Sequence, residues 1–198
     1  ELACSSDFDH LSDLALLTQA GYLTIKRRQG RTIYVGYPDQ EVADSMAELY
    51  SNMLLRGKTL ETVGAGALES APKSGNVSGL FTAANHAFSA IDYARHPIAN
   101  EKHCQAFLRI FIAGADYDAT AERLSAGGRS DLELDAGGCH WVIELKFQRR
   151  GESAGRLLEE AARQLRSRNY GAASSRRLAR AAAVFSEEER AFVRWQEA

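Results

Sequence analysis

The sequence has few cysteines and no long hydrophobic run, and each shortage excludes a class of protein. Its three cysteines, Cys4, Cys104 and Cys139, lie far apart and lack Cys-x-x-Cys spacing. An odd number without that spacing argues against a disulfide framework and a zinc site, so we expect free thiols in a reducing cytoplasm. No stretch approaches the roughly 18 consecutive apolar residues of a membrane span, and the N-terminus lacks the basic-then-apolar order of a signal peptide. We therefore expect a cytoplasmic protein with no membrane partner.

The chain is nevertheless long and apolar enough to bury a core. Its 198 residues are 45% hydrophobic, which fits one medium domain or a main domain with a small appendage. It begins with Glu1 rather than Met, just before a helical pattern. We expect it to be the C-terminal part of a longer protein.

Hydrophobic periodicity predicts two parts. Residues 1–95 read as a mainly helical segment with one β-hairpin: helices over 9–20, 40–55 and 77–93, and strands over 22–26 and 32–37. Helix, hairpin and helix together resemble part of a winged helix, and a structural spacer is the favoured alternative. Residues 96–198 alternate as an α/β domain: a helix over 100–113, strands over 117–124, 129–135 and 140–148, a helix over 152–168, a strand over 179–185 and a closing helix over 187–195.

Two of these predicted strands carry acidic residues and a lysine. Asp131 lies in GRSDLEL, and Glu144 and Lys146 lie in HWVIELKF, with DAGGC between the two stretches. Side chains alternate along a strand, so Glu144 and Lys146 share one sheet face while Leu145 points to the core. Asp131 reaches the same face from the neighbouring strand. Clustered charges on an apolar strand cost desolvation energy, and they are favoured where a hard cation sits between the oxygens, as in a nuclease-like site.

The net charge is small, but it is unevenly distributed. The formal charge of −2 argues against a protein that coats nucleic acid nonspecifically, whereas residues 146–180 contain ten basic and three acidic residues, a local charge of +7. Basic residues next to a metal site are what a phosphodiester backbone requires. The alternative is a solvated Arg-rich helix with i,i+4 pairs.

Four segments in order resemble the PD-(D/E)xK nuclease superfamily: NEKHCQAFL, AERLSAGGRSDLEL, WVIELKF and QLRSRNY. They are similar to the subgroup found as the C-terminal domain of bacterial AAA-ATPase-like proteins, and GYLTIK and VGYPDQEV are similar to the segment that precedes the nuclease core there. The resemblance covers nearly the whole chain. It implies a restriction-endonuclease-like αβββαβ core with a central mixed sheet, an AAA-ATPase-like domain as partner, and nucleic acid, with DNA favoured, as substrate.

The resemblance also implies roles for individual residues. It places the catalytic positions on Glu101, Asp131, Glu144, Lys146 and Gln164. Asp131, Glu144 and the backbone carbonyl of Leu145 are the implied ligands of Mg²⁺, with Mn²⁺ as an alternative, which agrees with the oxygen preference of these ions. Lys146 would orient or help deprotonate a water, and Glu101 would hold a second cation or a water. The residues assigned to nucleic-acid binding are Arg149, Arg150, Arg163, Arg166 and Tyr170.

Structural alternatives stay open for these positions. Ion pairs of Asp131 with Arg129 and of Lys146 with Glu144 would suit a solvated sheet, and Glu101 would suit the first turn of a helix as a dipole partner. We expect a solvated Glu133, an exposed His140 and a partly buried Trp141. The favoured function is Mg²⁺-dependent hydrolysis of phosphodiester bonds in DNA. The alternative is a catalytically silent nucleic-acid-binding or regulatory module of an AAA-ATPase-like protein.

Overall fold

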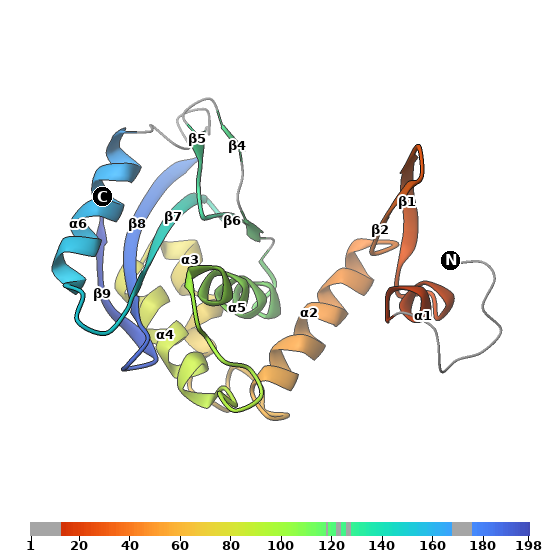
Figure 1. Cartoon of the computed structure of the whole chain (residues 1–198), viewed down its shortest axis with the longest axis horizontal. Helices are drawn as coiled ribbons and strands as arrows, with labels where there is room; N and C mark the ends of the chain where they lie inside the picture. The colour runs from red at the N-terminus through yellow and green to blue at the C-terminus, as the bar shows by residue number, and fades with distance from the viewer. Residues whose placement is uncertain (1–12, 118, 122–123, 126–127, 168–175) are drawn as a thin grey trace. The chain divides into compact units, whose positions relative to one another are not determined.

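The computed structural model describes residues 13–117, 119–121, 124–125, 128–167 and 176–198, and its helices and strands are labelled in Figure 1. The chain divides into two units, with the boundary between Met46 and Ala47. Within the described ranges, no helix has the length and apolar character needed to cross a membrane.

The first unit contains a short helix and the predicted hairpin. Helix α1 covers Asp13–Gln19, strand β1 covers Thr24–Gln29 and strand β2 covers Thr32–Gly36. The strands pair antiparallel with Gln29 opposite Thr32, so Gly30 and Arg31 form a two-residue turn. Gly30 has a φ of 60°, a conformation that glycine adopts without steric cost. The hairpin prediction is confirmed, whereas the start of the helix predicted over 9–20 lies outside the described residues.

A series of helices leads to the sheet of the second unit. Asn100 begins the helix that precedes the sheet, because its side chain accepts a hydrogen bond from the backbone N–H of His103 at 3.0 Å. Helices predicted over 40–55, 77–93 and 100–113 are confirmed with small shifts at their ends. The helical elements are α2 (Gln40–Leu54, which crosses the unit boundary), the 3₁₀ helix η2 (Gly66–Glu69), α3 (Ala71–Ser74), α4 (Val77–Ala90) and α5 (Glu101–Gly114).

The sheet of the second unit is mixed and has five strands. In spatial order they are β3 (Ala119–Ala121), β6 (Leu132–Ala136), β7 (Cys139–Gln148), β8 (Arg177–Ser186) and β9 (Ala191–Glu197). Only β7 and β8 are parallel, and helix α6 (Ala154–Ser167) makes the crossover between them. Two short segments, β4 (Leu124–Ser125) and β5 (Gly128–Arg129), form a separate pair. The predicted α/β class with a central mixed sheet is confirmed.

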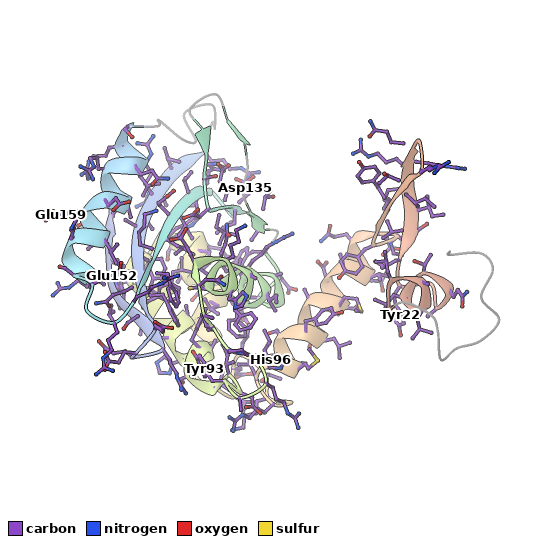
Figure 2. All side chains as sticks on the ribbon, viewed as in Figure 1. Tyr22, Tyr93, His96, Asp135, Glu152 and Glu159 are labelled. Atoms are coloured by element: carbon purple, nitrogen blue, oxygen red, sulfur yellow. The ribbon has the colours of Figure 1, made fainter. Side chains whose placement is uncertain are left out.

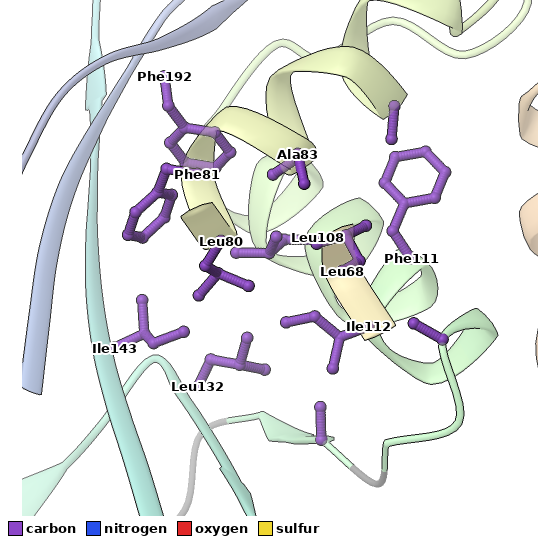
Figure 3. Close-up of a cluster of buried hydrophobic side chains, with 14 of the residues drawn as sticks. Leu68, Leu80, Phe81, Ala83, Leu108, Phe111, Ile112, Leu132, Ile143 and Phe192 are labelled. Carbon is purple, nitrogen blue, oxygen red and sulfur yellow. The ribbon is translucent and has the colours of Figure 1, made fainter. Parts of the chain in front are cut away.

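Helices cover both faces of this sheet (Figure 1). On one face, Val142 of β7 and Ala182 of β8 pack against α6. On the other face, a larger core joins the sheet to α4, α5 and η2 (Figure 3). Most of β7 is buried, and its Trp141, Val142, Ile143 and Leu145 supply apolar side chains to both faces of the sheet. Residues of η2, α3, α4 and the end of α2 share the larger core. The domain boundary predicted between residues 95 and 96 stays a prediction.

The closing helix predicted over 187–195 is wrong, because this part of the chain forms a turn and then β9. Strand β9 pairs with β8, and its Phe192 packs against aromatic rings of α4 and β8. The side chain of Asn85, on α4, accepts a hydrogen bond from the N–H of Phe192 and donates one to its carbonyl. The run of Glu187, Glu188 and Glu189 favours a helix locally. Pairing with β8 and burial of Phe192 outweigh that preference.

Candidate active site

The candidate site lies where the pairing of β6 with β7 ends. The last paired residues are Leu132 and Ile143, so one further step places Asp131 opposite Glu144. Asp131 is in a bend before β6 rather than in the strand that the sequence predicted. Its Oδ2 accepts a hydrogen bond from the backbone N–H of Leu145 at 2.7 Å. Since the N–H and C=O of one strand residue point to the same edge, the Leu145 carbonyl also faces the Asp131 side.

Glu101 lies beside the same edge of β7, although it belongs to α5. It lies in the first turn of α5, and the backbone N–H of Phe147 lowers the pKa of its carboxyl group. Two carboxylates, those of Asp131 and Glu101, therefore interact with successive outward-pointing N–H groups of β7 where β6 no longer pairs, and that of Asp131 accepts a hydrogen bond there. The break in the ladder brings together acidic residues that are 30 positions apart in the sequence.

Glu144 and Lys146 lie on the sheet face that α6 covers. Glu144 is fully buried, and Lys146 Nζ is 3.2 Å from its Oε1. The lysine side chain is only 15% exposed. This ion pair was one of the structural alternatives that the sequence left open. It is not, however, a pair on a solvated surface, because little solvent reaches either group.

The electrostatic environment couples all four charged groups. Burial raises the pKa of Glu101, and the charges of Asp131 and Glu160 raise it further, against the lowering effects of Lys146 and the Phe147 N–H. For Lys146, burial disfavours the ammonium, but attraction to Glu144, Glu101 and Asp131 outweighs burial and raises its pKa. Lys146 therefore keeps its proton at neutral pH, and Glu101 holds a proton more readily than an exposed glutamate.

Two further neighbours of this site lie on α5, and sequence reasoning assigned neither of them to it. The side-chain amide of Gln105 donates a hydrogen bond to the backbone carbonyl of Asp131, and it thereby ties α5 to the bend. Burial raises the pKa of the Cys104 thiol, and the nearby charges of Glu101 and Asp131 raise it further. Cys104 and Gln105 follow Glu101 by three and four positions, so i,i+3 and i,i+4 spacing along a helix was the sequence signal that could have placed them beside Glu101.

The donor set suits a hard cation. Among the described residues, no three His, Cys, Asp or Glu side chains are arranged around a common point that would hold a metal ion. Mg²⁺ needs fewer protein ligands, because it keeps several waters and binds through one or two carboxylates. Asp131 and Glu144 are two such carboxylates on adjacent segments, and the Leu145 carbonyl adds a neutral oxygen. The residues therefore fit the ion as a small open site rather than as a closed cage.

The predicted nucleic-acid contacts are distributed around α6. Gln164 is partly buried, whereas Arg149, Arg150, Arg163 and Arg166 are exposed. In the described part of the chain, Arg163 and Arg166 form no ion pair, so i,i+4 pairing does not account for the Arg-rich helix. Tyr170 lies outside the described residues. An open pocket on α6 is lined by Arg156, Glu159, Glu160, Arg163 and Arg166.

Three expectations about nearby residues are wrong. Glu133 and His140 are buried rather than solvated, because Glu133 accepts a hydrogen bond from Ser130 Oγ at 2.7 Å and lies 3.6 Å from His140 Nε2. His140 Nδ1 also lies 2.8 Å from Oδ1 of Asp135. Trp141 is fully buried and donates a hydrogen bond to the carbonyl of Pro72, so it is not available to stack on a base.

One comparison with known proteins agrees with this arrangement of elements. Residues 99–195 match the family model of the PD-(D/E)XK nuclease superfamily. The match begins beside the N-cap of α5 and ends within β9, so it includes every residue of the candidate site. Proteins of the PD-(D/E)XK superfamily are typically nucleases and generally use divalent metal ions. Neither the comparison with curated proteins nor that with solved structures found a match.

Proposed function

We propose that residues 99–195 form a metal-dependent nuclease that hydrolyses phosphodiester bonds, with DNA as its substrate. The observation that carries this proposal is the convergence of Asp131, Glu144, Lys146 and Glu101 at the break between β6 and β7. Burying a carboxylate beside a lysine costs desolvation energy, which a purely structural role does not require. It is useful where charge must be stabilised during a reaction.

Asp131, Glu144 and the Leu145 carbonyl would hold Mg²⁺, with Mn²⁺ as a substitute. When bound, such an ion polarises a phosphate oxygen and lowers the pKa of a coordinated water. The oxygens of this set come from a strand and a bend that one hydrogen bond links, from Leu145 N–H to Asp131 Oδ2. That link fixes the separation of the ligands before any substrate binds.

Lys146 and Glu101 would act on protons and charge. Because attraction to three carboxylates raises the pKa of Lys146, its ammonium would orient the attacking water and offset negative charge on the phosphate. This favours an electrostatic role over the deprotonating role that the sequence left open. Glu101, with its raised pKa, would hold a proton at its carboxyl group near the reacting water.

The substrate would lie along α6 and the turn after β7. Arg149, Arg150, Arg163 and Arg166 would contact phosphate oxygens, because guanidinium groups donate paired hydrogen bonds to them. Gln164 would contact the backbone through its amide, and Tyr170 would add a contact from the segment after α6. We further propose, on the sequence resemblance, that the domain works in the cytoplasm beside an AAA-ATPase-like domain.

The test is cleavage of supercoiled plasmid, linear duplex, single-stranded DNA and RNA with Mg²⁺, with Mn²⁺ and with chelator. We expect nicking of DNA that requires the metal, and its loss in Lys146→Met. Lys58→Met serves as the matched control, because Lys58 is exposed and lies outside the site. Cleavage that persists in chelator, or that is equal in both lysine variants, would rule out this site.

A catalytically silent module remains the second candidate. The ion pair between Lys146 and Glu144 favours it, since a carboxylate held by a lysine is a weaker ligand for a metal ion. A silent module would bind nucleic acid in chelator and release no nicked product with either metal. The same plasmid assay, paired with a binding measurement, separates the two candidates.

A further inference from the structure

The β1–β2 hairpin of the first unit carries positive charge without any acidic residue. Residues 21–38 contain Lys26, Arg27, Arg28 and Arg31 and no Asp or Glu, although the whole chain has a net charge of −2. All four basic residues are exposed. Figure 2 shows the nitrogen-tipped side chains that extend from this hairpin. The charge is therefore concentrated on one small element.

The fold makes little use of these charges. Lys26 Nζ donates a hydrogen bond to the Pro38 carbonyl at 3.1 Å, and Arg28 Nε donates one to the Gly30 carbonyl at 3.1 Å. Within the described ranges, none of the four side chains has a carboxylate at ion-pair distance. Local bonds of this kind hold the side chains in place but leave their charge unneutralised. Self-repulsion among them opposes folding, so a partner with negative charge would relieve it.

The hairpin also presents aromatic rings. The guanidinium of Arg27 lies 3.9 Å from the ring centroid of Tyr34, which is directly opposite it in the strand pair. Arg28 pairs with Ile33 on the alternate face, so basic side chains project from both sides of the ribbon. Tyr22, just before β1, is 49% exposed. Guanidinium groups beside tyrosine rings combine phosphate contacts with stacking on bases.

We propose that the β1–β2 hairpin is a second nucleic-acid-binding surface of this protein, distinct from the arginines of α6. Three of its four basic residues are arginine, whose planar fork matches phosphate oxygens better than the point charge of lysine. The inference rests on the proposed function and extends it, because it makes the hairpin a second element that binds the nucleic-acid substrate of the nuclease. It makes the hairpin a binding element rather than a structural spacer.

The experiment measures binding of the whole chain to labelled duplex and single-stranded DNA by fluorescence anisotropy in chelator, over a series of salt concentrations. The variant Lys26→Gln/Arg27→Gln/Arg28→Gln/Arg31→Gln removes the hairpin charge. A matched control, Arg56→Gln/Lys58→Gln/Lys73→Gln/Arg95→Gln, removes the same charge from exposed positions outside both the hairpin and α6. Circular dichroism and thermal unfolding check that each variant is folded.

We expect the hairpin variant to bind duplex DNA at least about tenfold more weakly near physiological salt, and the control to bind like the wild type. The slope of log K against log salt should become shallower by about 3 to 4 if all four residues contact phosphates. Tyr34→Ala should weaken binding to single strands by roughly fivefold or more. Equal affinities and slopes for hairpin variant and control would overturn the proposal. So would wild-type binding to vesicles of phosphatidylserine and phosphatidylcholine without binding to DNA.

Failure of this inference and failure of the proposed function give different results. Asp131→Asn should keep full affinity for DNA in chelator while it loses metal-dependent cleavage. Loss of cleavage in the hairpin variant at low substrate, restored at saturating substrate, would further support a binding role for the hairpin. If the wild type binds DNA through the hairpin but does not cleave it, the proposed nuclease function is wrong and the inference about the hairpin still holds.

Discussion

Lys146 Nζ and Glu144 Oε1 lie 3.2 Å apart on a strand that helices cover on both faces, and Glu144 is fully buried there. A carboxylate in such a place is costly unless a positive charge is near. Lys146 therefore stabilises the folded protein by offsetting the charge of Glu144, in addition to any catalytic role. Its removal should change stability as well as activity.

Lys146→Met should lower the free energy of unfolding by about 3 kcal/mol, the low end for breaking a buried pair, because Lys146 is slightly exposed. Urea unfolding followed by circular dichroism measures this. The double variant Glu144→Gln/Lys146→Met should recover most of the loss, since no charge is then left without its counterpart. It should remain inactive in cleavage. Equal stabilities of wild type and the lysine variant would contradict the buried-pair account.

Asp131→Asn should reduce cleavage by roughly 100-fold or more while the domain stays folded. An asparagine oxygen can still accept the hydrogen bond from Leu145 N–H, and loss of one negative charge relieves repulsion with Glu101. We therefore expect the free energy of unfolding to change by no more than about 1 kcal/mol. Asp135→Asn, the same change on β6 away from the site, serves as the control and should cleave normally.

Glu101→Gln should flatten the pH dependence of stability in the metal-free protein. The pKa of Glu101 is raised in the folded state, so folding favours its protonated form. That advantage is present below the pKa of the unfolded chain and is lost as pH rises through the folded value. Unfolding free energies measured at a series of pH values should fall across this window in the wild type and fall less in the variant. An unchanged profile would show that folding does not raise the pKa of Glu101.

Phe192→Ala should lower the free energy of unfolding by about 3 to 5 kcal/mol, because its ring fills the core between α4 and β8. Arg194→Ala, an exposed position on the same strand, should change it by no more than about 0.5 kcal/mol. Thermal or urea unfolding compares the two. A small effect at Phe192 would contradict the assignment of a strand to this segment.

Much of the fold could be predicted because the signals are local. Alternating or continuous apolar residues identify β6, β7 and β8, and Asn100 marks the start of α5. The grouping of Glu144 with Lys146 follows from strand alternation alone. Strand β9 was missed because its identity depends on pairing with β8 and on two hydrogen bonds between the backbone of Phe192 and the side chain of Asn85, 107 residues earlier.

The detail of the site depends on contacts that no local pattern encodes. The buried Glu133 accepts a hydrogen bond from Ser130, three residues earlier, and the buried His140 contacts Asp135 across the β6–β7 pair. The tie from Gln105 to the Asp131 carbonyl requires α5 to lie against the bend. Polar side chains on strands look solvated in a sequence, and only the packed structure shows which of them are enclosed.

The break in the β6–β7 ladder also leaves two backbone amides of β7 that can report on whether the site is occupied. The Leu145 amide proton is bound by the carboxylate of Asp131, and the Phe147 N–H acts on the carboxyl group of Glu101, so anything that binds those oxygens should disturb the two amides first. Their resonances in a ¹H–¹⁵N spectrum should shift when a divalent ion is titrated into a solution of ¹⁵N-labelled protein. Occupancy could thus be followed residue by residue, without a substrate and without turnover.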